Sequence, residues 1–167
     1  MEHVHDYLII GAGMAADAAA KAIREVDAAA NVGIVGAEAQ PPYQRPPLSK
    51  ALWKGDKSVA DIDLATAQSG ATLHSGRRIE SLDRVARTAR DDRGDSYRYR
   101  RLLLATGATP RRLPFEGGER IIHFRTLDDY QALRRYAQPG AFIAVIGGGF
   151  IGCELAASLC SLGCKVT

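Results

Sequence analysis

A short apolar run, closely spaced glycines and a helical pattern follow one another twice in this chain of 167 residues. The first copy spans residues 6–35 and turns at residues 11–13; the second spans residues 141–167 and turns at residues 147–149. A continuous apolar run of this length is typical of a strand that is buried on both faces. Strands that alternate with helices indicate βαβ units, so the repeat predicts an α/β fold with parallel strands.

Both turns have the residue spacing of a dinucleotide-binding site. In the first turn, Gly11 permits a tight bend, Gly13 lets a pyrophosphate approach the backbone, and the small Ala16 lets the helix pack on its strand. The helix N-terminus then points N–H groups at the phosphates. Glu38 follows the second strand at a plausible spacing for the acid that binds a ribose hydroxyl. The alternative is a tight turn that binds no nucleotide.

The second turn repeats this spacing with Gly147, Gly149 and Gly152. Two such turns in one chain predict two dinucleotides, one held tightly and one exchanging. The acid or arginine that distinguishes NADH from NADPH is expected beyond residue 167.

Between the two copies we expect a surface loop, a β-rich segment and one further helix. The proline-rich loop, residues 37–58, has a short helix near 48–53, and its Arg45 and Lys50 are either phosphate-binding cations or solvated charges. Strands are predicted at 71–74, 78–82, 85–89 and 96–104, with a hairpin turn at 92–95. The last strand is expected to be buried and to end in small residues. Thr126 and Asp129 predict the capped start of a helix at 127–137.

Composition excludes several classes of protein. Hydrophobic residues make up 46% and charged residues 25% of the chain, which is ordinary for globular proteins and too apolar for a disordered one. No run approaches the roughly 18 apolar residues of a membrane helix, and the N-terminus lacks a secretory signal, so we expect a cytoplasmic protein. We expect Cys160 and Cys164 to be buried thiols, the four histidines to be surface or strand residues, and no metal site.

Five strings, in order along nearly the whole chain, resemble the ferredoxin, rubredoxin and putidaredoxin reductases and the related apoptosis-inducing factors. They are GAGMAA at 11–16, PYQRPPLSK at 42–50, LLLATGATP at 102–110, FRTLDD at 124–129 and IGGGFIGCE at 146–154. The resemblance implies a Rossmann-like FAD-binding domain, a parallel sheet with a β-meander insertion, followed by the first βαβ unit of a truncated NAD(P)-binding domain. The implied bounds are 1–112 for the FAD domain, 113–139 for a linker and helix, and 140–167 for the second domain.

The resemblance also implies which residues contact each cofactor. FAD contacts fall on Gly11, Gly13, Met14, Ala15, Ala16, Glu38, Arg45, Lys50, Ile79, Ala105, Thr106, Gly107 and Arg125. NAD(P) contacts fall on Gly147, Gly149, Phe150, Ile151, Gly152 and Glu154. Lys50 is implied near the reactive edge of the flavin, Ile79 at the adenine and Glu154 near the nicotinamide. No catalytic side chain is required, because the cofactors carry the chemistry.

The implied function is an FAD-dependent NAD(P)H oxidoreductase, in which hydride passes from NAD(P)H to FAD and electrons then pass to a small iron–sulfur protein such as a ferredoxin or rubredoxin. The alternative is a non-enzymatic nucleotide-binding module. A disulfide reductase is set aside, because residues 36–60 contain no cysteine. We expect this chain to be the N-terminal piece of a protein more than twice as long, to which the activity belongs.

Arginine is dense between residues 77 and 125, where thirteen of them fall. We expect a solvated hairpin face, balanced by Asp83, Asp91, Asp92 and Asp95. The alternative is a docking face for an acidic electron-transfer partner. No helix-turn-helix or aromatic–basic pattern supports a nucleic-acid partner, and no apolar span supports a membrane one.

Overall fold

The computed structural model describes residues 1–114 and 118–167, so part of the predicted linker, residues 115–117, lies outside the described residues. The chain divides into two compact units. The first unit comprises residues 1–44 and 63–107, and the second comprises residues 45–62 and 108–167. The cofactor-domain bounds that the resemblance implies stay a prediction.

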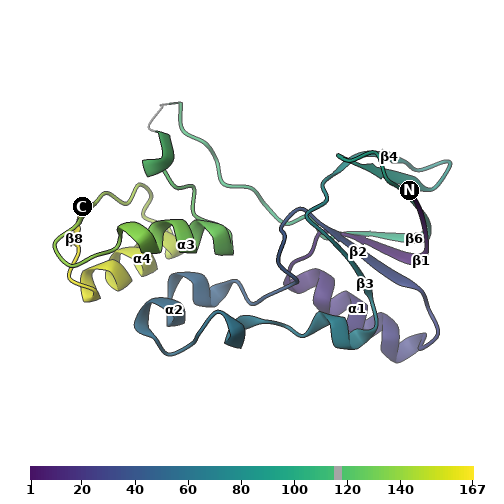
Figure 1. Ribbon diagram of the computed structural model, residues 1–167, viewed down its shortest axis with the longest axis horizontal. Coiled ribbons are helices and arrows are strands. Elements are labelled where there is room, and N and C mark those ends of the chain that lie inside the picture. The colour runs from purple at the N-terminus through teal and green to yellow at the C-terminus, as the bar shows by residue number, and fades with distance from the viewer. Residues whose placement is uncertain (115–117) are drawn as a thin grey trace. The chain divides into compact units, whose positions relative to one another are not determined.

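The first unit contains a six-stranded sheet in the order β3-β2-β1-β6-β5-β4 (Figure 1). Its parallel strands are β1 (Glu2–Ile10), β2 (Val32–Gly36), β3 (Thr72–Ser75) and β6 (Ser96–Leu104). Two antiparallel strands, β4 (Ile79–Asp83) and β5 (Thr88–Asp91), follow on beside β6. The predicted α/β class, with a parallel sheet and a β-meander, is confirmed.

Apolar side chains cover both faces of this sheet. On one face, α1 (Met14–Val26) packs its buried Ala16 and Ala20 against a cluster that includes Ile9. Both alanines are small, so the helix axis can approach the strands closely. On the other face, Leu8 of β1 packs in a second cluster with Tyr97 of β6.

Polar contacts tie α1 to the loop beside it. Asp17 is buried in the first turn of α1, and its carboxylate accepts a 2.7 Å hydrogen bond from the Thr66 hydroxyl of η3 (Thr66–Ser69). Arg24 in the last turn donates to the carbonyl oxygens of Ser69 and Ala30, each at 2.9 Å. One side chain of the helix therefore satisfies carbonyl oxygens on two different segments beside it.

The meander differs from the prediction in its second strand. The strand expected at 85–89 begins only at Thr88. The Asp83 carboxylate accepts the amides of Val85 and Ala86 at 2.9 and 2.8 Å and turns the chain there, and Arg87 adopts a positive φ of 53°. Short side-chain acceptors compete with strand pairing in this way.

The last strand, β6, has the predicted bounds but not the predicted burial. Leu103 and Leu104 are 41% and 60% exposed. The prediction was wrong because β5 pairs with β6 only at Ser96–Arg98, so the C-terminal half of β6 is paired on the β1 side alone among the described strands.

Asp91 at the end of β5 forms hydrogen bonds to several residues of the meander. Its side chain is buried and accepts hydrogen bonds from the Tyr97 hydroxyl at 2.8 Å and from the amides of Arg93 and Asp95 at 3.0 and 2.9 Å. The Arg77 guanidinium lies 3.2 Å away. Burial favours the neutral acid, but these hydrogen bonds and the Arg77 charge outweigh it and lower the pKa of Asp91.

Replacing Asp91 is expected to destabilise the first unit. Asp91→Ala leaves the buried Tyr97 hydroxyl without its acceptor, so the free energy of unfolding should fall by about 2–4 kcal/mol. The control is Asp92→Ala, because Asp92 is exposed and its carboxylate accepts the Arg78 amide at 3.1 Å; its loss should stay within about 1 kcal/mol. Urea unfolding followed by circular dichroism measures both variants, and equal losses would contradict the role given to Asp91.

The second unit is built from short elements. In chain order they are η1 (Pro46–Ser49), α2 (Ala51–Lys54), η2 (Ala60–Ile62), η4 (Gly118–Arg120), α3 (Leu127–Tyr136), β7 (Phe142–Ile143), α4 (Phe150–Ser161) and β8 (Lys165–Val166). The capped start of α3 is confirmed, because the Thr126 hydroxyl accepts the Asp129 amide and the Asp129 carboxylate accepts the Thr126 amide. The rings of Trp53 and Tyr130, with centroids 5.0 Å apart, pack α2 against α3.

The βαβ pattern at the end of the chain is present in this unit. β7 and β8 pair in parallel, and each has two residues, so the apolar run before the second turn forms a shorter strand than its length suggested. Gly163 ends the α4 segment with a φ of +82°, a conformation that glycine adopts at little cost. Cys164 is buried as expected, but the expectation for Cys160 was wrong, because its side of α4 is exposed.

Three histidines meet in the first unit although they are far apart in sequence. Nε2 of His5 and Nε2 of His74 are 3.2 Å apart, and the His3 ring stacks on Tyr97. Gly33 makes room for this group, since a Cβ there would lie 2.5 Å from the His5 ring. Burial, then the neighbouring His3 and His5, lower the pKa of His74 to about 4.

Among the described residues, no group of three or more His, Cys, Asp and Glu side chains is arranged to hold a metal ion. None of the described helices combines the length and the apolar character that crossing a membrane requires.

Candidate functional site

The first glycine turn lies where three parallel strands end. Gly11 follows β1 with a φ of +113°, and its amide donates to the Val35 carbonyl of β2 at 2.8 Å. Beyond the end of β6, the Ala105 amide donates to the Ile10 carbonyl at 2.8 Å. A Cβ on Gly11 would overlap the Ala105 carbonyl, so glycine is needed here both for its conformation and for space. The segment predicted to touch the cofactor at Ala105, Thr106 and Gly107 therefore begins against this turn.

The helix that follows presents its first residues at the surface. Gly13 is the extended N-cap of α1, and Met14 and Ala15 are exposed, whereas Ala16 is fully buried. The first amides of a helix have no partner within the helix, so this end can bind an anion. The positions of Gly11, Gly13 and Ala16 fit a dinucleotide pyrophosphate, with a backbone approach at the turn and close packing at the third position.

Glu38 lies two residues beyond β2, at the same edge of the first unit. Its carboxylate accepts a 2.5 Å hydrogen bond from the Tyr43 hydroxyl, and its carbonyl accepts the Gly76 amide at 2.9 Å. The Arg77 amide donates to the Gly36 carbonyl at 2.8 Å, which brings the chain that leads into β4 beside the end of β2. Glu38 and Ile79, the predicted ribose and adenine contacts, are therefore held on neighbouring segments.

The second glycine turn has the same construction in the second unit. Gly147 has a φ of +115°, and Gly149 is the extended N-cap of α4. A Cβ on Gly152 would overlap the Gly147 carbonyl, so a residue without a side chain is needed for the helix to pack on its own turn. Phe150 and Ile151 are exposed at the start of the helix. The geometry fits a second dinucleotide phosphate.

Glu154, one turn into α4, meets the proline-rich loop. Its Oε2 accepts a 2.6 Å hydrogen bond from the Ser49 hydroxyl, and its Oε1 lies 3.0 Å from the Lys50 ammonium. The Ser49 hydroxyl and then the Lys50 ammonium lower the pKa of Glu154. The structure thus brings together Lys50 and Glu154, two predicted site residues that lie in different strings of the sequence.

Arg45 and Arg125 form a second pairing of predicted site residues. An Arg45 guanidinium nitrogen donates to the Arg125 carbonyl at 3.2 Å, although 80 residues separate the two. Both side chains are half-buried. The Asp129 carboxylate accepts the Arg125 amide at 2.9 Å and fixes that backbone at the start of α3. Two arginines joined by this contact suit an anionic ligand.

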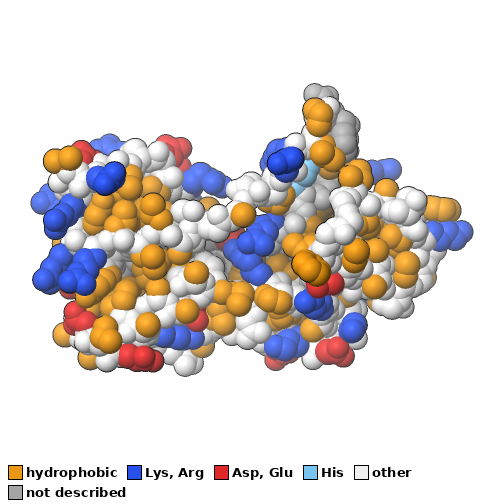
Figure 2. Space-filling model, turned by 180° about the vertical axis from the view of Figure 1, so that it is seen from behind, with side chains coloured by type: hydrophobic (Ala, Val, Ile, Leu, Met, Phe, Trp, Pro, Cys, Tyr) orange, Lys and Arg blue, Asp and Glu red, His pale blue; other side chains and the backbone are white. Residues whose placement is uncertain are grey.

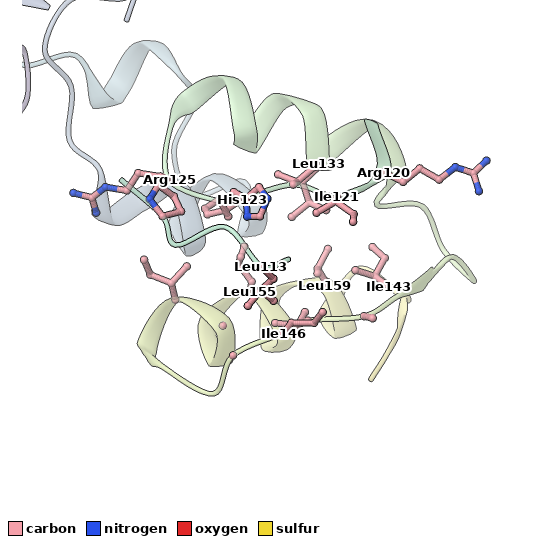
Figure 3. Close-up of a pocket in the computed structure, with 18 of the residues that line it drawn as sticks. Leu113, Arg120, Ile121, His123, Arg125, Leu133, Ile143, Ile146, Leu155 and Leu159 are labelled. Carbon is pink, nitrogen blue, oxygen red and sulfur yellow. The ribbon is translucent and has the colours of Figure 1, made fainter. Parts of the chain in front are cut away.

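An apolar cavity of about 810 Å³, which the sequence did not reveal, lies beside the second glycine turn (Figure 3). Its walls include Leu133 from α3 and Leu155 and Leu159 from α4, and the side chains of Ile121 and His123 point into it from the segment before α3. Gly147 and Gly152 also line it. Nearly half of the lining residues fall between residues 108 and 125. This stretch has no periodic pattern, and most of it was predicted as a linker.

The arginine-rich face has the mixed character expected of a solvated hairpin. Lys and Arg side chains stand among apolar ones over the surface in Figure 2 and gather toward the left-hand edge of that view. Arg77 pairs with Asp91 and Asp95, and Arg98 pairs with Glu2. Arg90 and Arg100 are exposed on β5 and β6. The acids Asp83 and Asp92 accept backbone amides and do not only balance charge.

Comparison with known proteins places the chain in a family. The pyridine nucleotide-disulphide oxidoreductase family matches residues 5–167, so the chain belongs to it. The chain is 42% identical, over 96% of its length, to the ferredoxin–NAD(+) reductase component of the anthranilate 1,2-dioxygenase system of Burkholderia cepacia, and covers 41% of that protein. It is 40% identical, over 95% of its length, to the corresponding component of the biphenyl dioxygenase system of Paraburkholderia xenovorans, and covers 40% of that one.

A solved structure agrees with these relatives. The chain matches the covalent putidaredoxin reductase–putidaredoxin complex with a TM-score of 0.84 and 31% identity, over 97% of this chain and 41% of that one. The chain thus spans about two fifths of the length of the relatives it matches.

A methyl group at the first turn is expected to disrupt it. Gly11→Ala combines a strained φ with overlap on the Ala105 carbonyl, so its free energy of unfolding should fall by about 3 kcal/mol or more. Gly94→Ala is the matched control, because Gly94 has a φ of +83° but a Cβ there would meet nothing within 4 Å. The free energy of unfolding of Gly94→Ala should fall by only about 1 kcal/mol, the cost of the strained φ. Chemical unfolding compares them, and equal losses would show that the approach to Ala105 does not matter.

Proposed function

We propose that this chain is part of an FAD-dependent oxidoreductase that takes hydride from NADH and passes electrons to a small iron–sulfur protein. The observation that carries the proposal is the presence of two glycine turns, each with its own helix N-terminus and each shaped by a close glycine–carbonyl approach. One turn suffices for one dinucleotide, whereas a flavin reductase needs two. The names of the relatives specify NAD(+) and ferredoxin, which supports NADH and an iron–sulfur acceptor.

The roles of the chain's residues follow from each unit. In the first unit, Gly11, Gly13 and the α1 N-terminus would hold the FAD pyrophosphate, and Glu38 would bind the adenosine ribose. In the second unit, Gly147, Gly149 and Gly152 would hold the NADH pyrophosphate, with Glu154 near the nicotinamide. The FAD contacts implied for Arg45, Lys50, Ile79 and Arg125 belong to the same proposal. When bound, FAD supplies hydride acceptance and single-electron transfer, and the side chains supply orientation and charge.

The competing proposal is a nucleotide-binding module without turnover. It keeps the same two turns and requires no electron acceptor, so the geometry of the turns does not separate the two. The Lys50–Glu154 ion pair favours the oxidoreductase, because a binding module has no need of a charged pair held one helical turn from a phosphate site.

Colour separates the two functions. The purified protein is expected to carry yellow flavin in stoichiometric amount and to bleach with NADH under anaerobic conditions, which absorbance near the flavin bands measures. Gly11→Ala should purify colourless, because its turn cannot hold the pyrophosphate, and Gly94→Ala should stay yellow. A colourless wild type, or flavin that NADH does not bleach, would favour the binding module instead.

Electron transfer to a ferredoxin should depend on ionic strength if the exposed arginines of the meander attract an acidic partner. Raising the salt concentration screens the long-range attraction, so reduction of ferredoxin should slow steeply between low and physiological salt. Reduction of a small neutral dye by NADH serves as the control and should change little. If both acceptors showed the same salt dependence, the meander would have no role in docking the partner and its arginines would be solvated charges.

A further inference from the structure

Ser49 is a buried hydroxyl in the second unit that contacts two residues of one helix. It is 5% exposed at the end of η1, and its hydroxyl donates to Glu154 Oε2 at 2.6 Å. Its carbonyl accepts a 3.1 Å hydrogen bond from the Ser158 hydroxyl. Glu154 and Ser158 are four residues apart on α4 and therefore lie on the same face of that helix. One residue of the loop is thus bonded to two successive turns of the helix.

The two oxygens of the Glu154 carboxylate contact two neighbouring residues of the loop. Oε2 faces the Ser49 hydroxyl, and Oε1 faces the Lys50 ammonium at 3.0 Å. The Lys50 side chain is 52% exposed and would by itself hold the carboxylate loosely, because exposed ion pairs contribute little. A hydrogen bond from a buried hydroxyl to a carboxylate is short and directional. The orientation of Glu154 therefore depends on Ser49 more than on Lys50.

The loop that carries Ser49 is fixed independently of Glu154. The Trp53 indole donates to the Leu48 carbonyl at 2.6 Å, and the Tyr130 hydroxyl of α3 donates to the Leu52 carbonyl at 3.2 Å. Pro47 and Leu48 are buried beside Ser49. The segment that carries the hydroxyl is therefore held in place by these contacts, as a residue that orients a charged side chain requires.

We propose that Ser49, whose backbone carbonyl is bonded by the Ser158 hydroxyl, is a positioning residue: its own hydroxyl fixes the Glu154 carboxylate with one oxygen toward the Lys50 ammonium. The consequence for function rests on the dinucleotide sites proposed above, because the oriented ion pair would be presented to the nicotinamide. The lowered pKa of Glu154 agrees with this geometry, since the Ser49 hydrogen bond is its largest cause. Lys50 is the charged group that pairs with the carboxylate among the described residues.

The first test needs no cofactor. In protein labelled with ¹³C at the glutamate carboxyls, the Glu154 titration midpoint should move upward in Ser49→Ala and stay low in Ser49→Thr, which keeps a hydroxyl. Ser161→Ala is the matched control, because Ser161 lies on the same helix and donates to the Ser158 carbonyl at 2.7 Å. Its midpoint should equal that of the wild type. A merely structural role for Ser49 would alter stability but leave the midpoint unmoved, and that result overturns the proposal.

A second variant covers the case in which Ser49→Ala does not fold. Ser49→Cys occupies nearly the same space but its thiol is a weak donor, so the midpoint should again move upward. A folded Ser49→Cys protein with the wild-type midpoint overturns the proposal equally well.

The second test uses the flavin-loaded protein. The limiting rate of flavin reduction by NADH should fall about tenfold or more in Ser49→Ala, because the ion pair is no longer oriented, and should recover in Ser49→Thr. A wild-type rate in Ser49→Ala overturns the proposal. If the wild type binds no flavin, or NADH does not reduce it, the proposed function fails, whereas the cofactor-free titration still decides the role of Ser49.

Discussion

The close approach of Gly11 to the Ala105 carbonyl is the constraint on which the first candidate site depends. It brings the ends of β1 and β6 into contact, while the Gly11 amide bonds to the end of β2. No residue with a side chain fits at this point in that conformation. The turn in turn sets where α1 begins, and so where the free amides of the helix are directed. The part of the site that fits a pyrophosphate is thus defined by backbone atoms.

Features that depend on local chemistry were predicted correctly from the sequence. The tight turns at Gly11 and Gly147, the bounds of β6 and the capping box at Thr126 each follow from a few neighbouring residues. The strand expected at 85–89 failed for an equally local reason, since one carboxylate acceptor at Asp83 turned the chain. Burial was harder, because the exposure of Leu104 depends on how far β5 extends along β6 and not on any property of the leucine.

Contacts between residues far apart in the chain could not be predicted from the sequence. The Ser49–Glu154 hydrogen bond joins residues 105 positions apart, and the two ends give no signal of each other. The resemblance placed Lys50 and Glu154 near the reacting cofactors, yet it assigned nothing to Ser49. The large apolar cavity was not predicted either, because segments without a periodic sequence pattern form much of its wall. Only the folded chain shows which polar groups are held by another element.

The histidine cluster gives the first unit a sensitivity to protons. His74 has a pKa of about 4 in the folded protein, against an ordinary value of 6.5, because burial and its histidine neighbours oppose its charge. Between these two values the unfolded chain binds a proton at this position that the folded chain does not, so acidification over that range draws the equilibrium toward unfolding. The carboxylate of Asp91, whose pKa is lowered, works in the same direction at lower pH. Mild acid should therefore lower the stability of the first unit through His74, before the Asp91 carboxylate that holds the meander takes up its own proton.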